Sequence, residues 1–159
     1  MTILNILTLP DKRLKTIADP VVSFDADLKK LTKDMLETMY DAPGIGLAAT
    51  QVDVHKQVVV IDISEDKNNP ICLINPKIVE KNGLQTHEEG CLSVPNIYAK
   101  VKRASSIVVE AQNETGENIT IVADELLAVC IQHELDHLKG IVFLDHLSVM
   151  IASYRSPAG

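Results

Sequence analysis

The stretch from Gln132 to His137, which reads QHELDH, constrains this chain more than any other. On an α-helix, residues four apart lie one turn apart on the same face, so His133 and His137 can hold one metal ion. Glu134 then lies beside that ion, where a carboxylate can take a proton from a bound water instead of acting as a ligand. The pattern predicts a helix inside a metal-assisted hydrolase, with a third ligand still to be found.

Length and composition limit the kind of protein that can carry such a helix. The 159 residues, 46% of them hydrophobic, fit a single domain over residues 1–159 with its own core. No apolar run approaches the roughly 18 residues of a membrane span, and no signal or transit peptide is apparent, so we expect a cytoplasmic protein. The net charge of −7 argues against general nucleic-acid binding.

Hydrophobic periodicity predicts two long helices, over residues 25–40 and 125–139, and a short helical turn over 11–18. Runs of β-branched and apolar residues predict strands over 57–63, 71–74, 77–80, 84–88, 98–102, 105–111 and 117–123. Asn82-Gly83 predicts a hairpin between two of these strands. A final apolar run, residues 141–144, predicts one more strand.

Three thiols compete for the third ligand position. Cys72 lies within the apolar run ICLIN and is expected to be buried and inert. Cys130 shares a helical face with the two His residues, but it lies about 4.5 Å further toward the N-terminus at about 1.5 Å per residue, so it should line the pocket instead. Cys91 follows Gly90 at a strand end, from which a thiolate can reach a helix. We therefore predict Cys91, His133 and His137 as ligands, with water in the fourth position.

The segment GIGLAATQV, residues 44–52, combines two glycines with two alanines, which permits close approach of another backbone or a ligand. It is neither a dinucleotide fingerprint nor a P-loop, because the third Gly and the Gly-Lys-Ser/Thr sequence are missing. Gln51 is its polar side chain. Taken alone, a Gln in such a segment is more often a solvated loop amide.

Three separated segments together resemble the peptide deformylases: GIGLAATQ at 44–51, EGCLS at 89–93 and QHELDH at 132–137. They occur in the family's order and spacing over nearly all of the chain, and LPDKRL, LINP, VKR and HLKGIVFLDHLS add to the match. The resemblance implies an α+β fold with mixed or antiparallel sheets around a central helix that carries HELDH. It also implies a hydrolase that removes the N-terminal formyl group from formyl-methionyl nascent peptides and releases formate.

The resemblance implies roles for individual residues. Glu134 acts as general base and then protonates the leaving amine. The Gln51 side chain and the Leu92 backbone N–H bind the formyl oxygen as it becomes an oxyanion, and Gly46 lets the substrate backbone pass close by. The pocket for the methionine side chain is expected to be lined by Ile45, Leu126, Val129, Cys130 and the ring of His133.

The metal's identity does not follow from its ligands, because a Cys/His₂ set with an open position suits zinc, ferrous iron, nickel or cobalt. The resemblance favours Fe²⁺ in the cell, with Zn²⁺, Ni²⁺ or Co²⁺ possible in purified protein. Three features depart from the family: Tyr98 where many members have Arg, His87 at the pocket edge, and the tail SVMIASYRSPAG in place of a basic C-terminal helix. The tail weakens the expectation of ribosome contact by that route.

Charged residues in or beside the motifs predict a network around the site. Carboxylates commonly orient metal-bound His rings by accepting their second N–H. We expect Arg103 to pair with Glu89 or Asp136, and at least one of these carboxylates to support the site. The alternative is that all three are solvated surface charges.

Two other kinds of metal protein compete with this interpretation. A zinc metallopeptidase would share HExxH but take a later ligand, for which Asp145 and His146 are the candidates. A structural Cys/His module would need a fourth protein ligand and would leave Glu134 unexplained.

Overall fold

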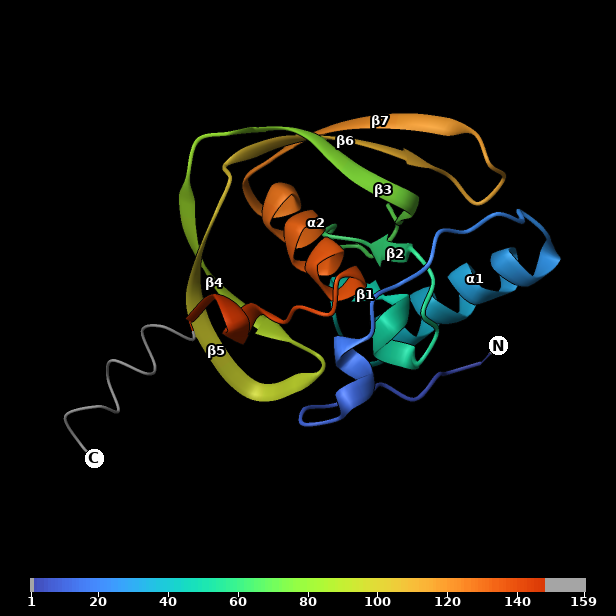
Figure 1. The fold of residues 1–159 in the computed structure, drawn as a ribbon, viewed down its shortest axis with the longest axis horizontal. Coiled ribbons are helices and arrows are strands. Elements are labelled where there is room, and N and C mark those ends of the chain that lie inside the picture. The colour runs from blue at the N-terminus through green and yellow to red at the C-terminus, as the bar shows by residue number, and fades with distance from the viewer. Residues whose placement is uncertain (1, 148–159) are drawn as a thin grey trace.

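The computed structural model describes residues 2–147 (Figure 1). Its helices are α1 (Ala26–Asp41) and α2 (Glu125–Leu138), with short 3₁₀ turns at η1 (Lys12–Lys15), η2 (Ala49–Val52) and η3 (Phe143–Leu147). Its strands are β1 (Gly46–Ala48), β2 (Val58–Ile61), β3 (Ile71–Asn82), β4 (Gln85–Cys91), β5 (Val94–Arg103), β6 (Ser106–Gln112) and β7 (Asn118–Asp124).

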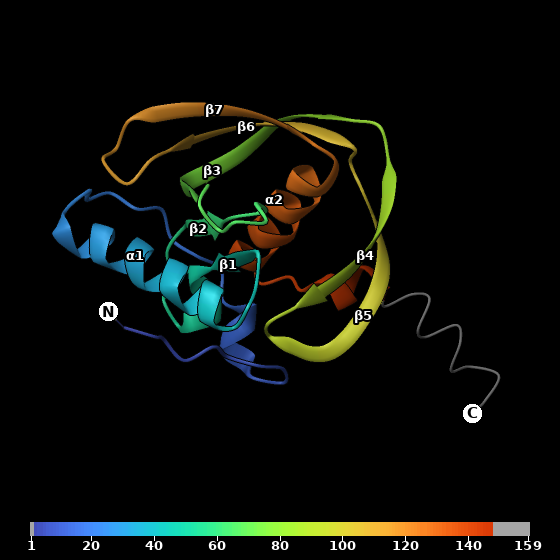
Figure 2. The ribbon, with the colours of Figure 1, turned by 180° about the vertical axis from the view of Figure 1, so that it is seen from behind.

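The strands form two antiparallel sheets that surround α2. One sheet has the order β1-β2-β3-β6-β7, and the other is the pair β4-β5. Figures 1 and 2 show β3, β6 and β7 arching over one side of α2, with β4 and β5 on another side. This α+β arrangement confirms the expected fold class, and the helix within it carries HELDH.

The burial of α2 explains why it is apolar around most of its circumference. Ala128, Ile131 and Leu135 belong to a core cluster with residues of the large sheet such as Val59 and Val109. A helix that is apolar on most faces is stable only where other elements cover those faces. The metal motif is therefore held on a helix with little freedom to move.

Helix α1 begins where the sequence predicts. The Asp25 side chain accepts a hydrogen bond from the Leu28 N–H at 3.1 Å, which caps the helix. Its inner face, including Met35 and Met39, packs with β2 residues such as Val58. These methionines fill the core, as their helical spacing indicates.

The two strands expected on either side of Pro76 are one strand, β3. Its pairing with β6 shifts register between Ile74 and Lys77, and Pro76 lies in that irregularity. A proline lacks the N–H that a regular ladder requires, but a bulge leaves one residue unpaired. Pro76 therefore bends the strand without ending it.

The hairpin expected at Asn82-Gly83 is absent. The end of β3 pairs with β6, at Asn82 and Ser106, whereas β4 pairs with β5. Gly83 has φ +69°, so the chain does turn there. The turn residues predict the local bend, but the partner of each strand depends on the rest of the fold, and here the chain passes from one sheet to the other.

The strand expected over residues 141–144 is also wrong, since this segment leads into the 3₁₀ turn η3. Phe143 packs with Val94 and Val101 of β5 in a separate small cluster. A short apolar run does not by itself distinguish a strand from a buried turn. The segment GIGLAATQV, in contrast, contains β1 and η2 and is largely buried.

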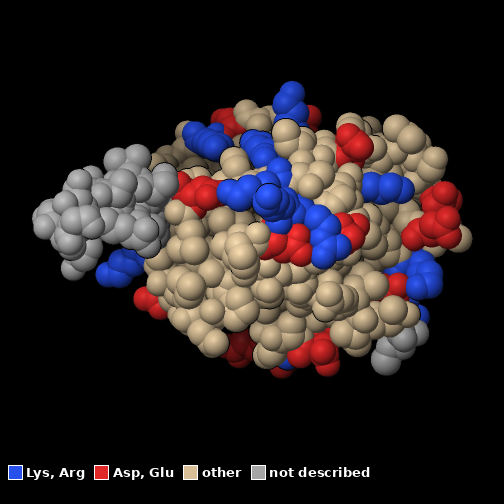
Figure 3. All heavy atoms as spheres, turned by 60° about the horizontal axis from the view of Figure 1, so that its bottom comes forward, with Lys and Arg blue, Asp and Glu red and all other residues tan. Residues whose placement is uncertain are grey.

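Within residues 2–147, no helix is both long enough and apolar enough to span a membrane. The C-terminal segment 148–159, to which the expectation about ribosome contact refers, lies outside the described residues. Figure 3 shows one face of the molecule with Lys, Arg, Asp and Glu interspersed across its upper half, while its lower half is mostly uncharged.

Candidate metal centre

Three donor atoms from two parts of the chain converge at the C-terminal half of α2. His133 Nε2 and His137 Nε2 lie 3.3 Å apart, and Cys91 Sγ at the end of β4 lies 3.3 Å from His137 Nε2. Donors about 2.0–2.3 Å from one tetrahedral ion would be separated by about 3.3–3.6 Å. The three residues expected as ligands therefore have the spacing of a metal site, and they form a candidate ligand group within the described part of the chain.

Glu89 determines which nitrogen of His133 faces the other donors. Its Oε1 accepts a hydrogen bond from His133 Nδ1 at 2.8 Å. The proton on Nδ1 leaves the lone pair of Nε2 directed at Cys91 and His137, as carboxylates do for many metal-bound histidines. Burial would lower the pKa of His133, but its contacts with Cys91, Glu134 and Glu89 outweigh burial and raise it to about 10. This raised pKa favours a second proton, on Nε2, in the metal-free protein. A metal ion would compete for Nε2 with that second proton, because metal binding displaces protons from ligands.

His137, in contrast, is held in its neutral form. Burial, with the nearby charges of His133 and Arg103, holds its pKa well below the usual value. Its Nδ1 is buried with no hydrogen-bond partner among the described residues. A neutral imidazole offers a lone pair at Nε2, so the state favoured by burial is also the state that binds a metal.

Glu134 lies beside the donors without taking part in the group. Its Oε1 is buried and has no hydrogen-bond partner within residues 2–147. Burial raises the pKa of Glu134 to about 7, against the opposing effects of His133 and Arg103. A buried carboxylate without a partner is costly, and such groups are typical of sites where a proton is exchanged.

Arg103 forms the ion pairs expected from the sequence. Its guanidinium contacts Glu89 through Nε at 2.5 Å and Nη2 at 2.9 Å, and contacts Asp136 through Nη1 at 2.9 Å. The side chains of Arg103 and Glu89 are each only 4% exposed, so the alternative of solvated surface charges is wrong for this pair. Hydrogen bonds from Arg103 and His133 hold the pKa of Glu89 below its usual value despite burial. The network links β4, β5 and α2.

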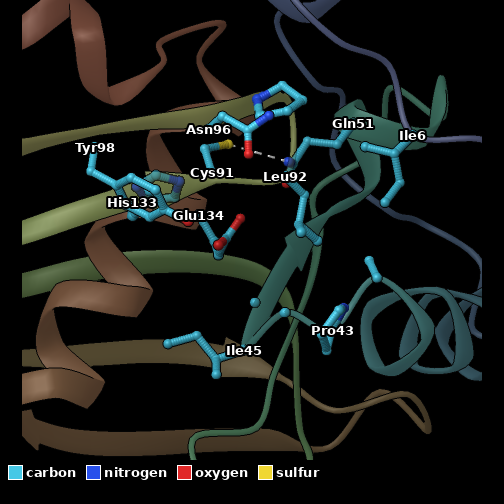
Figure 4. Close-up of a pocket in the computed structure, with 15 residues that line it drawn as sticks. Ile6, Pro43, Ile45, Gln51, Cys91, Leu92, Asn96, Tyr98, His133 and Glu134 are labelled. Carbon is cyan, nitrogen blue, oxygen red and sulfur yellow. Dashed lines mark hydrogen bonds between the residues drawn. The ribbon is translucent and has the colours of Figure 1, made fainter.

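Gln51 is buried, at 1% exposure, so it is not a solvated loop amide. Its Oε1 accepts a hydrogen bond from the Ala48 N–H at 2.9 Å, and its Nε2 lies 3.6 Å from Cys91 Sγ. Figure 4 shows Gln51, Cys91 and Leu92 at the same end of the cleft. The two residues expected to bind an oxyanion are thus brought together from segments about forty positions apart.

Two cavities meet at His133 and Glu134. The larger is an open cleft of about 640 Å³ between the Pro43–Gly46 segment and the start of β5. The smaller, about 100 Å³, adjoins it and shares Ile45, Gly90, His133 and Glu134 in its lining. Its lining includes all five residues expected for the methionine pocket: Ile45, Leu126, Val129, Cys130 and His133.

Gly46 lies against Glu134. A Cβ at position 46 would lie 2.5 Å from Glu134 Oε2, which is closer than real Cβ contacts. The carboxylate therefore occupies space that only glycine leaves open at this point of β1.

The positions that depart from the family lie at the edges of these cavities. Tyr98 is exposed, lines the larger cleft, and covers Gly90. His87 lines the smaller cavity from an exposed position on β4. Cys72 is partly buried, not fully as expected, and desolvation raises its pKa to about 12.

Sequence reasoning missed three residues that contact this site. The Phe143 ring stacks on the His133 ring with centroids 5.9 Å apart. Ser93 Oγ contacts Gln51, and His146 Nε2 contacts Asp136 Oδ2 at 2.8 Å. Ser93 lies within EGCLS, and Phe143 and His146 lie within HLKGIVFLDHLS, so the matching segments contain all three residues but do not indicate which side chains they contact.

The candidate ligands of a metallopeptidase site lie elsewhere. Asp145 Oδ2 accepts a hydrogen bond from the Val142 N–H, and His146 contacts Asp136. Neither belongs to the donor group formed by Cys91 and the two α2 histidines. Within the described residues, the geometry therefore favours the cysteine as the third ligand.

Comparison with known proteins agrees with this geometry. Residues 3–151 match the family model described as Polypeptide deformylase. The chain is 61% identical over 148 residues to a peptide deformylase of Neisseria gonorrhoeae, covering 93% of this chain and 89% of that one.

Solved structures show the same likeness. A peptide deformylase from Legionella pneumophila superposes with a TM-score of 0.90 at 47% identity, over 96% of this chain and 92% of that one. One from Synechococcus elongatus, in complex with actinonin, superposes with a TM-score of 0.88 at 46% identity, over 90% of this chain and 79% of that one.

Proposed function

This chain belongs to the polypeptide deformylase family, and we propose that it removes the N-terminal formyl group from formyl-methionyl nascent peptides, releasing formate. The observation that carries the proposal is the convergence of Cys91, His133 and His137 next to Glu134 at the junction of two cavities. We also propose that residues 1–159 act as one catalytic domain, in the cytoplasm, where nascent peptides are made.

We propose that Cys91, His133 and His137 hold the metal ion. The donor set suits it, since one thiolate and two neutral imidazoles leave a fourth position open. When bound, the ion supplies a Lewis acid that acidifies water and polarises the formyl carbonyl. Fe²⁺ is our proposal for the cell, with Zn²⁺, Ni²⁺ or Co²⁺ as alternatives in purified protein, because this donor set accepts all four.

Glu134 moves the proton in this proposal. Its buried carboxylate takes a proton from the attacking water and returns it to the amine that leaves. Burial supports this role because it brings the pKa of Glu134 to about 7, close to the pH at which both steps must occur. Glu89, Arg103 and Asp136 orient the site, with Glu89 holding the His133 ring through Nδ1.

The remaining residues bind the substrate. The Gln51 Nε2 and the Leu92 backbone N–H donate to the formyl oxygen as charge develops on it. Gly46 allows the peptide backbone to pass close to Glu134. The smaller cavity, of about 100 Å³, accepts the methionine side chain.

The test is formate release from a formyl-methionyl tripeptide under anaerobic conditions, with the acetyl-methionyl tripeptide as control. Mass spectrometry of the products distinguishes the reactions: deformylation removes only the formyl group, whereas a peptidase cuts between residues. Formate from the first peptide only, with an intact tripeptide, is the expected result. Cleavage of an internal peptide bond would favour a metallopeptidase.

Metal content is measured separately, by elemental analysis of protein purified without air. We expect about one ion per chain, and actinonin, which the Synechococcus elongatus relative binds, should bind to the loaded protein. Contact with the ribosome is a further proposal. Cosedimentation with ribosomes at low salt, lost at high salt, would support it.

A further inference from the structure

The carboxamide of Gln51 is held at both ends by the protein. The Ala48 N–H, which can only donate, bonds to Oε1 at 2.9 Å and so identifies the oxygen of the amide. The nitrogen therefore faces the β4–β5 connection, where Nε2 donates to Ser93 Oγ at 3.0 Å. Both residues are almost completely buried, with Gln51 at 1% and Ser93 at 0% exposure.

The two N–H groups of the Gln51 amide face different partners. Ser93 Oγ accepts one, and Nε2 also lies 3.6 Å from Cys91 Sγ at the edge of the cleft. The terminal torsion of a glutamine is broad, and with only Oε1 bonded, to Ala48, the amide would keep part of that freedom. The bond to Ser93 selects the orientation in which the second N–H points toward Cys91.

The N-terminal segment braces the same two residues through the backbone. The Leu7 N–H donates to the Gln51 carbonyl at 2.7 Å, and the Leu9 N–H donates to the Ser93 carbonyl at 2.9 Å. Two alternate residues of one segment thus bridge η2 and the β4–β5 connection. Gln51 and Ser93, 42 positions apart in sequence, are therefore held at a fixed separation.

We propose that Ser93 is a positioning residue for the reaction, acting only through the carboxamide of Gln51, with Leu7 and Leu9 as its backbone brace. Ser93 does not line the cleft, whereas Gln51 does, so its hydroxyl acts on the substrate indirectly. This inference rests on the proposed function and deepens it: the oxyanion donor is oriented by a residue that makes no contact with the substrate.

A double-mutant cycle tests the inference through kcat and KM for the formyl-methionyl tripeptide. Ser93→Ala should lower kcat about three- to tenfold, the equivalent of one neutral hydrogen bond, with KM unchanged because oxyanion contacts form in the transition state. Gln51→Ala should lower kcat more. In the Gln51→Ala background, Ser93→Ala should cause no further fall, since its only route of action has been removed.

Thr38→Val is the matched control. Thr38 is buried in α1, and its hydroxyl accepts from the Leu4 N–H and donates to the Asp34 carbonyl. Its loss should lower the melting temperature without changing kcat. If Ser93→Ala lowers kcat equally in the wild-type and Gln51→Ala backgrounds, or raises KM alone, the inference is overturned. A wild-type protein that releases no formate would instead refute the proposed function.

A second measurement uses the wild-type protein and does not depend on its activity. In ¹⁵N-labelled wild-type protein, one Nε2 proton of Gln51 should exchange slowly with solvent and show a through-space contact with the Ser93 Hβ protons. Gln132, whose buried amide donates to Ala104 and Ala128 carbonyls, provides the internal reference. Two fast-exchanging Gln51 protons, or no contact with Ser93, would overturn the inference. Ser93→Thr, which keeps an Oγ, should retain the slow proton.

Discussion

At the scale of single residues, burial sets the acidity of Glu134. The same carboxylate on a solvated helix would be an ordinary surface charge, but here one oxygen has no hydrogen-bond partner among the described residues and the pKa rises to about 7. Groups that are perturbed in this way at the base of a cleft are typical of active sites.

Glu134→Gln should separate binding from turnover. The amide keeps the size of the side chain but accepts no proton, so the metal content should stay the same while kcat falls about a hundredfold or more. Elemental analysis and formate release measure the two quantities on one sample. Normal turnover by the variant would show that Glu134 is not the base.

The three thiols should differ in reactivity. Desolvation raises the pKa of Cys72 and of Cys130 to about 12, and nearby Glu114 and Glu134 respectively act in the same direction. Alkylation requires the thiolate, so both should resist iodoacetamide at pH 8 and react only as the pH approaches 12.

In metal-free protein, Cys91 should therefore be alkylated first. Peptide mapping by mass spectrometry identifies the modified residue, and bound metal should protect Cys91, since its sulfur is the proposed third ligand. Modification of Cys72 or Cys130 before Cys91 at pH 8 would contradict the prediction.

At the scale of elements, the site depends on how closely β1 approaches α2. The glycine at position 46 lets the strand lie against Glu134, and the Arg103 network ties β4 and β5 to the same helix. Neither contact follows from the propensity of a single element, because each depends on two elements packing at one distance.

Gly46→Ala should therefore impair catalysis more than folding. The new Cβ would lie 2.5 Å from Glu134 Oε2, so the strand or the carboxylate must shift, and kcat should fall about tenfold or more while the melting temperature changes by a few degrees. Gly44→Ala is the comparison: its Cβ would meet the flexible end of Leu92, which can move, so its effect on kcat should be smaller.

At the scale of the whole molecule, a buried carboxylate distant from the donor atoms joins α1 to the end of β2. Asp62, at 2% exposure, accepts hydrogen bonds from Tyr40, Ser64 and Asn69. Burial opposes these bonds, but together they hold the pKa of Asp62 below 3.8. Burial and the contact with Asp62 raise the pKa of Tyr40 to about 12.

These two shifts predict the pH range of stability. The contribution of Asp62 is present above pH 3.8 and is lost as the pH falls through its lower folded pKa. That of Tyr40 is present below pH 10.0 and is lost as the pH rises toward about 12. The free energy of unfolding, measured with denaturant at each pH, should fall less steeply toward acid pH in Asp62→Asn than in the wild type. It should fall less steeply toward alkaline pH in Tyr40→Phe. Unchanged slopes in the variants would show that other groups control the pH dependence of stability.

The sequence by itself determined the features that depend on local spacing. A four-residue interval on a helix puts His133 and His137 on one face whatever surrounds it. Asp25 can cap a helix wherever the residues that follow it are helical. The reach of a short side chain likewise favours Cys91 over Cys130 without reference to any tertiary contact.

Only the tertiary structure decided which distant segments meet. Asn82-Gly83 turns the chain, yet the pairing of β3 with β6 and of β4 with β5 sets where that turn leads. Gln51 looks like a loop amide until Ser93 is brought against it. Turn chemistry and helical periodicity act over a few residues. Strand pairing and burial depend on the whole chain, because the stable arrangement is the one that buries the most apolar surface.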